Sequence, residues 1–287
     1  MTGRATRVLA ACAGVSAALA GAAAQAQWSI GAPGDRLAPA GAHRYAMLLF
    51  SNPVPGREAE FNDWYQNVHL GDLVQLEGWT GAQRFRIVTT VKPPPAAEAR
   101  RQGYLTIWDQ EGAEPQGPAA RMAAAFRAGK VRLSPAIDTG PGAVASATYE
   151  ATGPRTPRNP PAPAPNPDAP RPNRYAVLDF SDPPAGAEAK FDALVDQRIK
   201  AVLAVPGWVA AQRFRRTPAA AGAPAPGKPS RLVVWEVQAP SAQAALDSLA
   251  SAIAAGAVAA PPADPRTAEV VFWEPISPYV TKDLVVR

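Results

Sequence analysis

The chain contains two copies of one segment. Residues 58–85 read EAEFNDWYQNVHLGDLVQLEGWTGAQRF, and residues 188–214 read EAKFDALVDQRIKAVLAVPGWVAAQRF, which is one residue shorter. A matching pair of apolar runs precedes them, RYAMLLFS at 44–51 and RYAVLDFS at 174–181. Because the matches follow the same order in both halves, the sequence predicts two domains of one fold.

Each half has the residue pattern of strand, helix, strand, strand, helix, strand. In the first half the run at 44–51 suits a buried strand, and apolar residues after Pro55-Gly56 recur at helical spacing, with Gly71 expected to weaken that helix. This order is ferredoxin-like. A four-stranded sheet with helices on one face leaves its other face bare. We therefore predict an α+β fold of two tandem ferredoxin-like βαββαβ domains, packed sheet to sheet.

The remaining segments are termini and a connection. Arg4 and Arg7, an apolar run and Ala24-Gln25-Ala26 predict a secretory signal peptide. A proline-rich stretch without large apolar residues predicts an extended linker between the halves. The predicted boundaries are signal peptide 1–26, loose leader 27–43, first domain 44–151, linker 152–173, second domain 174–275 and a C-terminal extension 276–287 that has no counterpart in the first half.

Composition excludes several functions. The formal net charge is +5, but basic residues are interspersed with acidic ones, so a nucleic-acid partner is not expected. Cys12 is the single cysteine and lies in the predicted signal peptide, which predicts a mature chain without disulfides or thiol chemistry. His43 and His69 are the only histidines, so no metal site is expected. We expect a periplasmic or secreted protein without a membrane partner after cleavage; association of two chains into a homo-oligomer stays open.

The two copies differ on one face of the predicted helix. The first copy has Trp64, Tyr65 and His69. Counted from the start of each copy, the second has aliphatic residues there: Leu194, Val195 and Ile199. Since aliphatic side chains suit a buried position, we expect this face to point inward, where a polar pair needs partners. The sequence thus predicts one polar site, in the first half, and an aliphatic filling in the second.

His69 is the candidate catalytic residue because imidazole titrates near neutral pH. Tyr65 lies one helical turn before it, so the phenol and the imidazole can reach one ligand. The alternative is a helix-end histidine bonded to a backbone carbonyl or to water.

Three further residues are candidates for substrate binding. Trp64 can form the wall of an aromatic site or pack in the core. Asp72 can orient the imidazole or remain a solvated loop acid. Arg84 recurs in the second copy, which favours a scaffold role, but it can also anchor an anionic substrate. Asp179 replaces Leu49 on the matching strand and faces either a second cavity or a sheet edge.

The run F-N-D-W-Y-Q-N-V-H, followed by G-W-T-G-A-Q-R-F, resembles the EthD-like branch of the dimeric α+β barrel superfamily. That branch typically shows a W-Y-x-x-x-H helix, a Pro-Gly turn and an R-F strand. Here the turn is Glu77-Gly78 in the first half and Pro206-Gly207 in the second, which lacks the W-Y-x-x-x-H motif. The resemblance implies a dimeric α+β barrel duplicated within one chain, with ligands between helices and sheet. Its members include cofactor-free monooxygenases, isomerases, cyclases, dehydratases and haem-degrading enzymes.

The leading hypothesis is an exported, cofactor-independent enzyme that acts on a small molecule. His69 would be the general acid/base and Tyr65 a hydrogen-bond donor, in isomerisation, elimination or cyclisation of an aromatic or lactone-like substrate. Oxygen-dependent oxidation without a cofactor is a variant. Two alternatives stay open: a non-catalytic binder of a hydrophobic ligand or of haem, with His69 as axial ligand, and a structural or assembly module.

Overall fold

The computed structural model of the chain describes residues 42–88, 102–159, 173–217, 229–262 and 268–285. The predicted signal peptide and most of the predicted leader and linker lie outside these ranges. Within them, no helix is both long and apolar enough to cross a membrane.

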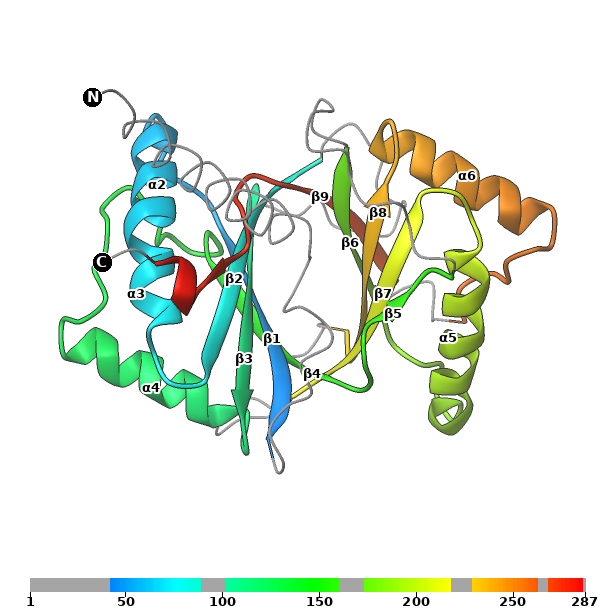
Figure 1. Cartoon of the computed structure of the whole chain (residues 1–287), viewed down its shortest axis with the longest axis horizontal. Helices are drawn as coiled ribbons and strands as arrows, with labels where there is room; N and C mark the ends of the chain where they lie inside the picture. The colour runs from blue at the N-terminus through cyan, green and yellow to red at the C-terminus, as the bar shows by residue number, and fades with distance from the viewer. Residues whose placement is uncertain (1–41, 89–101, 160–172, 218–228, 263–267, 286–287) are drawn as a thin grey trace, which may run out of the picture.

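Eight strands close into one antiparallel barrel at the centre of the molecule (Figure 1). Around the barrel they run β2-β3-β1-β4-β7-β8-β6-β9, and β9 pairs with β2 to complete the circle. Their bounds are β1 His43–Ser51, β2 Trp79–Ile87, β3 Tyr104–Gly112, β4 Ala145–Ala151, β6 Arg174–Ser181, β7 Trp208–Arg216, β8 Arg231–Gln238 and β9 Glu269–Pro275.

The halves meet in a different way from a simple face-to-face sandwich. Each half supplies four neighbouring strands, and the edge strands join across the halves as β4 with β7 and β9 with β2. An open edge strand carries unpaired N–H and C=O groups, and joining the edges pairs many of them. The two inner faces then share one core, which includes Leu48, Phe85, Leu178 and Trp273. The predicted packing of the two sheets against each other is therefore confirmed, and the structure adds that their edge strands also join.

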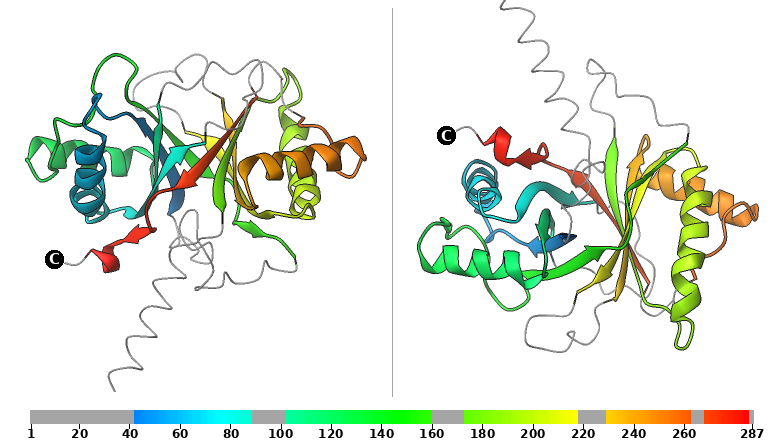
Figure 2. Two further views of the ribbon diagram at one scale, coloured as in Figure 1. Left: turned by 90° about the horizontal axis from the view of Figure 1, so that it is seen from above. Right: turned by 60° about the horizontal axis from the view of Figure 1, so that its bottom comes forward.

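Helices cover the outside of the barrel on two opposite sides, so the molecule has helix, barrel and helix layers (Figures 1 and 2). Those of the first half are α2 Glu58–Trp64, the π-helical turn η1 Tyr65–His69, α3 Leu70–Val74 and α4 Gln116–Arg127. Those of the second half are α5 Glu188–Leu203 and α6 Ala242–Ala254. Each helical layer packs on its part of the barrel through a separate apolar core.

The repeated helix differs between the halves at its centre. In the second half α5 runs without interruption, whereas in the first half η1 separates α2 from α3. The first copy is one residue longer, and a π-turn adds one residue to a helix without breaking it. The helix continues through Gly71, where an added Cβ would lie 3.3 Å from Val285 Cγ1. The irregularity therefore falls on Tyr65–His69, upstream of the expected weak point.

Each half continues into a short strand on the other half. After β4, β5 Thr156–Pro157 pairs with β7; after β9, β10 Val280–Thr281 pairs with β2. We call residues 152–158 and 276–281 the two straps. A short 3-10 turn, η2 Lys282–Leu284, follows the second strap. Figure 2 shows β9 crossing the barrel toward the first half.

The straps make matching contacts. Arg155 of the first strap donates to Glu236 on β8 at 2.6 Å, and Tyr279 of the second donates to Asp109 on β3 at 2.7 Å. Asp109 and Glu236 occupy corresponding positions in the repeat. The prediction that the C-terminal extension lacks a counterpart is therefore wrong: residues 152–158, assigned to the linker, are that counterpart.

Candidate functional site

The helix face that distinguishes the first half points into the interior between helix and barrel. Tyr65 is fully buried, and His69 and Trp64 are 5% and 7% exposed. This confirms the predicted inward orientation of all three side chains. The π-turn contributes directly, because it begins at Tyr65 and ends at His69 and so sets how these two side chains are spaced.

Aromatic rings enclose the imidazole of His69. Its centroid lies 4.5 Å from that of Trp64, 5.0 Å from that of Tyr65 and 6.0 Å from that of Trp108 on β3. Phe126 of α4 lies at 6.4 Å. The surroundings are therefore nearly apolar, which disfavours any charge on the imidazole.

Three polar atoms in this cluster make no hydrogen bond of standard geometry among the described residues. They are the Tyr65 hydroxyl, Nδ1 of His69 and the indole Nε1 of Trp108. Thr106 and Trp108 nevertheless lie close enough to the Tyr65 hydroxyl to act against the rise of its pKa. A buried polar group without a partner costs about 1–3 kcal/mol. Three such groups in one cluster leave hydrogen-bonding capacity that a polar ligand or water would satisfy.

Burial controls the protonation of this cluster. Desolvation lowers the pKa of His69 to about 4, although Asp72 and the Arg132 carbonyl act in the opposite direction. Desolvation also raises the pKa of Tyr65 to about 12, with Thr106, Arg84 and Trp108 limiting the rise. At neutral pH the imidazole is neutral and the phenol keeps its proton. The expectation that His69 titrates near neutral pH is thus corrected for the closed site.

Asp72 is neither a solvated loop acid nor a direct partner of the imidazole. It lies on α3, and its carboxylate accepts from Arg132 Nη2 at 2.6 Å, from Nε at 3.0 Å and from the backbone N–H at 2.9 Å. Burial acts to raise the pKa of Asp72, but the hydrogen bonds and charge of Arg132 outweigh it, so the pKa is lowered. The carbonyl of Arg132 accepts from Trp64 Nε1 at 3.0 Å. Asp72 thus fixes the backbone that positions Trp64.

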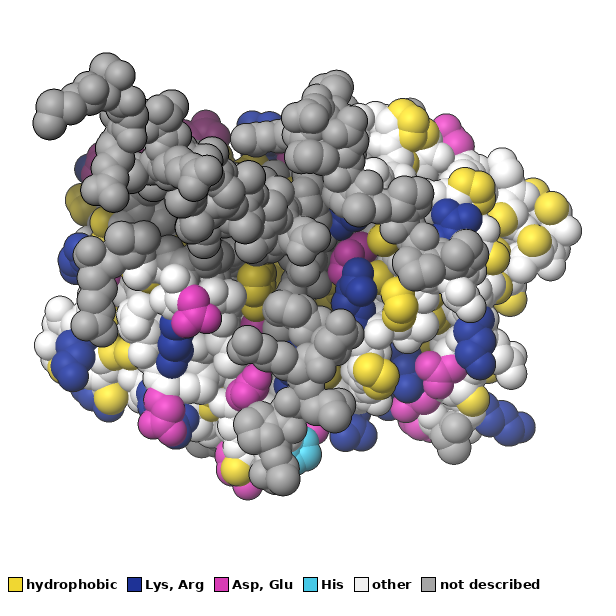
Figure 3. Space-filling model, in the orientation of Figure 1, with side chains coloured by type: hydrophobic (Ala, Val, Ile, Leu, Met, Phe, Trp, Pro, Cys, Tyr) yellow, Lys and Arg dark blue, Asp and Glu magenta, His cyan; other side chains and the backbone are white. Residues whose placement is uncertain are grey.

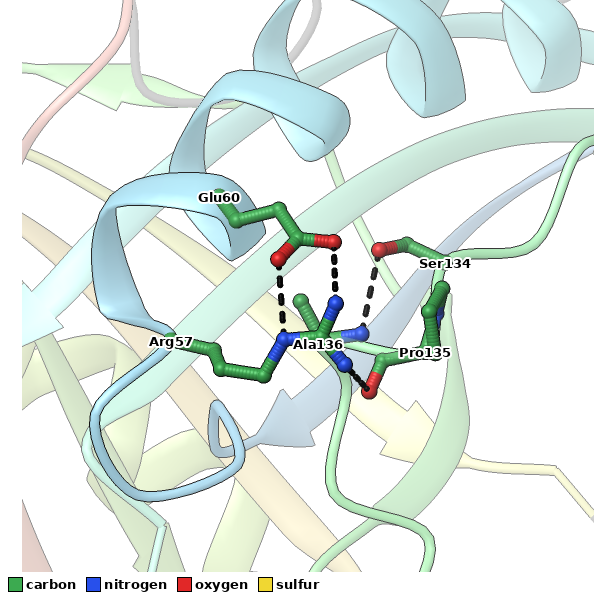
Figure 4. A network of polar contacts seen from close by, with 5 residues as sticks. All are labelled: Arg57, Glu60, Ser134, Pro135 and Ala136. Carbon is green, nitrogen blue, oxygen red and sulfur yellow. Dashed lines mark hydrogen bonds and ion pairs between the residues drawn. The ribbon is translucent and has the colours of Figure 1, made fainter.

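A second clamp holds the same loop at the start of the helix (Figure 4). Arg57 donates to Glu60 through Nε at 2.8 Å and Nη2 at 2.6 Å, and to the Pro135 carbonyl at 2.9 Å. Val131 and Ala136 of this loop are buried against the helix–barrel interior. The loop between α4 and β4 therefore covers the cluster and is fixed at both ends of the helix.

Arg84 extends from β2 into the same interior and is 3% exposed. It donates to the Asn62 carbonyl at 3.2 Å and to Asn62 Oδ1 at 2.7 Å, and its guanidinium lies 4.5 Å from the centroid of the Tyr65 ring. Burial lowers the pKa of Arg84 to about 10, so it stays charged at neutral pH. Arg213, its counterpart, instead forms an ion pair with Asp196 at 2.9 Å. The predicted scaffold pairing is therefore found at Arg213, which has a carboxylate partner. Arg84 forms no ion pair with a carboxylate among the described residues.

A polar path leads from Arg84 to the surface. Asn62 Nδ2 donates to the Tyr104 hydroxyl at 3.4 Å, and that hydroxyl donates to the Glu58 carboxylate. Tyr104 and Glu58 line an open cleft of about 570 Å³ between the halves, together with Arg86, which donates to Glu274. This volume suits a small molecule. The sequence did not reveal this path, because Tyr104 is 42 residues from Asn62 and only the fold brings the two side chains together.

The predicted aliphatic filling of the second half is confirmed only in part. Val195 and Ile199 are buried, but Leu194 is 46% exposed. The side chain that takes the place of His69 is Arg198, which is 8% exposed. Arg198 donates to the carbonyl of Ala259, the residue that corresponds to Arg132. Counting from the start of each copy matches His69 with Ile199. The additional residue in the π-turn of the first half shifts the match by one position, to Arg198.

The sequence matches no protein-family model and no curated protein. Among solved structures, an anthrone oxidase-like protein is 14% identical, with 85% of this chain and 95% of that chain covered at a TM-score of 0.48. A chlorite dismutase from Candidatus Nitrospira defluvii is 12% identical, with 81% and 91% covered at a TM-score of 0.44. At these values the likenesses assign neither a family nor an activity.

Proposed function

We propose that the chain is a small-molecule enzyme whose site lies in the first half, around Tyr65, His69 and Trp108. The observation that carries this proposal is the set of three buried polar atoms without partners in an aromatic interior. A purely structural interior gains stability when such atoms are removed. Their presence is accounted for if a substrate oxygen accepts hydrogen bonds from the Tyr65 hydroxyl and the Trp108 indole, and if an acidic hydrogen of the substrate meets Nδ1 of His69.

The proposed chemistry is proton transfer without a cofactor. The Tyr65 hydroxyl and the Trp108 indole N–H donate to a carbonyl or phenolic oxygen, and the buried charge of Arg84 stabilises the negative charge that develops there. Nδ1 of the neutral His69 takes a proton from the adjacent substrate carbon, and the electron pair of the C–H bond moves onto the oxygen. Return of the proton elsewhere gives isomerisation, and loss of a leaving group gives elimination. Cyclisation follows when the same electron pair attacks a second carbonyl.

Access to this interior is proposed through the cleft beside Tyr104. The hydrogen bond between Tyr104 and Glu58 closes the path toward Asn62 and Arg84. A flat aromatic or lactone-like substrate suits the aromatic walls. In this proposal Trp64 is a wall of the site, and Asp72 positions the Arg132 loop behind it.

We also infer that the chain is a duplicated dimeric α+β barrel of the EthD-like type. Support comes from the matching strand orders of the halves, β2-β3-β1-β4 and β7-β8-β6-β9. It also comes from the straps, because Thr156 pairs with Ala211 as Val280 pairs with Ala82. The shared contact pattern extends to Gln83 and Gln212, each of which donates to a strap carbonyl.

The substitution Tyr65→Phe tests the proposed function. It removes a buried hydroxyl without a partner, so the free energy of unfolding should rise by about 1 kcal/mol. Binding of 1-naphthol, used as a phenolic probe and followed by tryptophan fluorescence, should weaken about tenfold with the lost hydrogen bond. Tyr45→Phe, at a buried tyrosine on β1 outside the cluster, serves as control. Higher stability with unchanged binding would favour the structural alternative.

Haem is tested separately. His69 is enclosed by the rings of Trp64, Tyr65 and Trp108, so the residues as arranged do not present an imidazole to a planar macrocycle, and no step is derived through haem. Titration of the purified chain with hemin should therefore give no stoichiometric Soret band. A saturable band that is lost in His69→Gln would overturn this and make the chain a haem binder.

A further inference from the structure

The second half contains a charged cluster at the place that the aromatic cluster occupies in the first. Arg198 of α5 stands where His69 stands, and Asp179 of β6 stands where Leu49 stands. Both lie beside Trp235, the counterpart of Trp108. The two halves therefore present different chemistry in equivalent positions. This cluster is independent of the site proposed for the first half.

Arg198 has donor capacity left over. Its Nη1 donates to the Ala259 carbonyl, while its buried Nε has no hydrogen-bond partner among the described residues. The side chain is 8% exposed. No carboxylate of the described residues forms an ion pair with it, because Asp179 interacts with Arg198 through charge but not through contact. A buried guanidinium in this state has a strong preference for an anion.

Asp179 completes the other side of the cluster. Its Oδ2 accepts from Trp235 Nε1 at 3.3 Å. Desolvation raises the pKa of Asp179, and the charge of Arg198 and the Trp235 hydrogen bond act against the rise. An anion on Arg198 would cancel part of that opposing effect. Both desolvation and a bound anion favour the protonated carboxyl group, which can donate to the anion as in a carboxyl–carboxylate pair.

A small pocket lies between these groups. Asp179, Ser181, Arg198 and Trp235 line it together with apolar side chains that include Phe191. Its volume of about 20 Å³ accommodates a group somewhat larger than a water molecule. Pro261 and Pro262 also line it.

We propose that this pocket binds the carboxylate group of a small organic acid. One carboxylate oxygen accepts from Arg198 Nε, and the other accepts from the Asp179 carboxyl group. Phe191, Val195 and Trp235 contact the apolar part of the acid. The second half is thus a carboxylate-binding site in its own right, and the chain has two chemically different sites.

Titration of the full chain with sodium formate and sodium acetate tests this proposal, with sodium chloride at equal ionic strength as reference. The readout is the indole N–H resonance of Trp235, assigned with Trp235→Phe. Formate or acetate should shift it saturably and chloride should not. Arg198→Gln should weaken the response at least tenfold. Arg127→Gln, which removes an exposed arginine on α4, should leave it unchanged.

Two substitutions at Asp179 sharpen the test. Asp179→Asn keeps a donor toward the anion and should retain binding, whereas Asp179→Leu restores the residue of the first half and should lose it. The wild-type titration decides the question even if a variant fails to fold. A missing or non-saturable shift, an equal response to chloride, or an unchanged response in Arg198→Gln would overturn the proposal.

Discussion

Between pH 7 and pH 4 the wild-type protein should lose about 3 kcal/mol more of its free energy of unfolding than the variant His69→Gln. The folded state holds the pKa of His69 at about 4, against 6.5 for an unperturbed histidine. Between these values the unfolded chain binds a proton that the folded chain does not, so stability falls as the pH falls through this window. Each pH unit contributes about 1.4 kcal/mol. Above about pH 6.5 the contribution is complete and constant.

Chemical denaturation at a series of pH values measures this difference. His43 and the carboxylates are present in both proteins, so their contributions largely cancel in the comparison. Parallel pH dependences for wild type and His69→Gln would show that His69 is hydrated and not enclosed. A bound ligand that accepts a hydrogen bond from protonated His69 would raise the pKa of His69 in the folded state. Such a ligand should therefore reduce the difference in stability between wild type and His69→Gln.

The substitution Gly81→Ala should destabilise the protein by about 3 kcal/mol. A Cβ at residue 81 would lie 2.2 Å from the hydroxyl oxygen of Tyr279, which is 2% exposed and hydrogen-bonded to Asp109. The tyrosine would have to leave its site, which combines an overpacking cost with the loss of a hydrogen bond to a charged group. Thermal and urea unfolding measure the loss.

Two controls accompany this substitution. Gly103→Ala should change stability by less than about 0.5 kcal/mol, since its new Cβ would have a nearest neighbour at 3.6 Å. In a Tyr279→Ala background, Gly81→Ala should cost little more, because the two residues share one contact. Wild-type stability in Gly81→Ala would show that the second strap does not hold β2. At Ala210, the counterpart of Gly81, the register of the first strap places Arg155 where the second strap has Tyr279.

The repeat and its periodicity predicted much of the local structure. Helical spacing placed Trp64, Tyr65 and His69 on an inward face, and alternation of apolar residues placed the strands. These are local properties, which the sequence encodes within a few residues. The resemblance implied a barrel, but the strand pairs that close it, β4 with β7 and β9 with β2, were not predicted because they come from opposite halves.

The correspondence between the two helices could not be read from the sequence. A one-residue difference between the copies fits an insertion anywhere along the helix. Only the position of the π-turn shows that His69 matches Arg198 and not Ile199. Likewise, Asp179 accepts a hydrogen bond from the indole of Trp235, whereas Leu49 at the same place offers the indole of Trp108 no acceptor. Such partners become visible only when strand pairing is known.

The exchange of straps has a consequence for the order in which the protein matures. During synthesis the first half emerges first, but its strand β2 pairs with the second strap, and Val285 lies against α3 beside Gly71. The interior around Tyr65 and His69 therefore lacks part of its cover until residues 276–285 have emerged. The half that is made first is therefore completed only after the strands of the second half have been made, so the proposed site forms later than the rest of the first half.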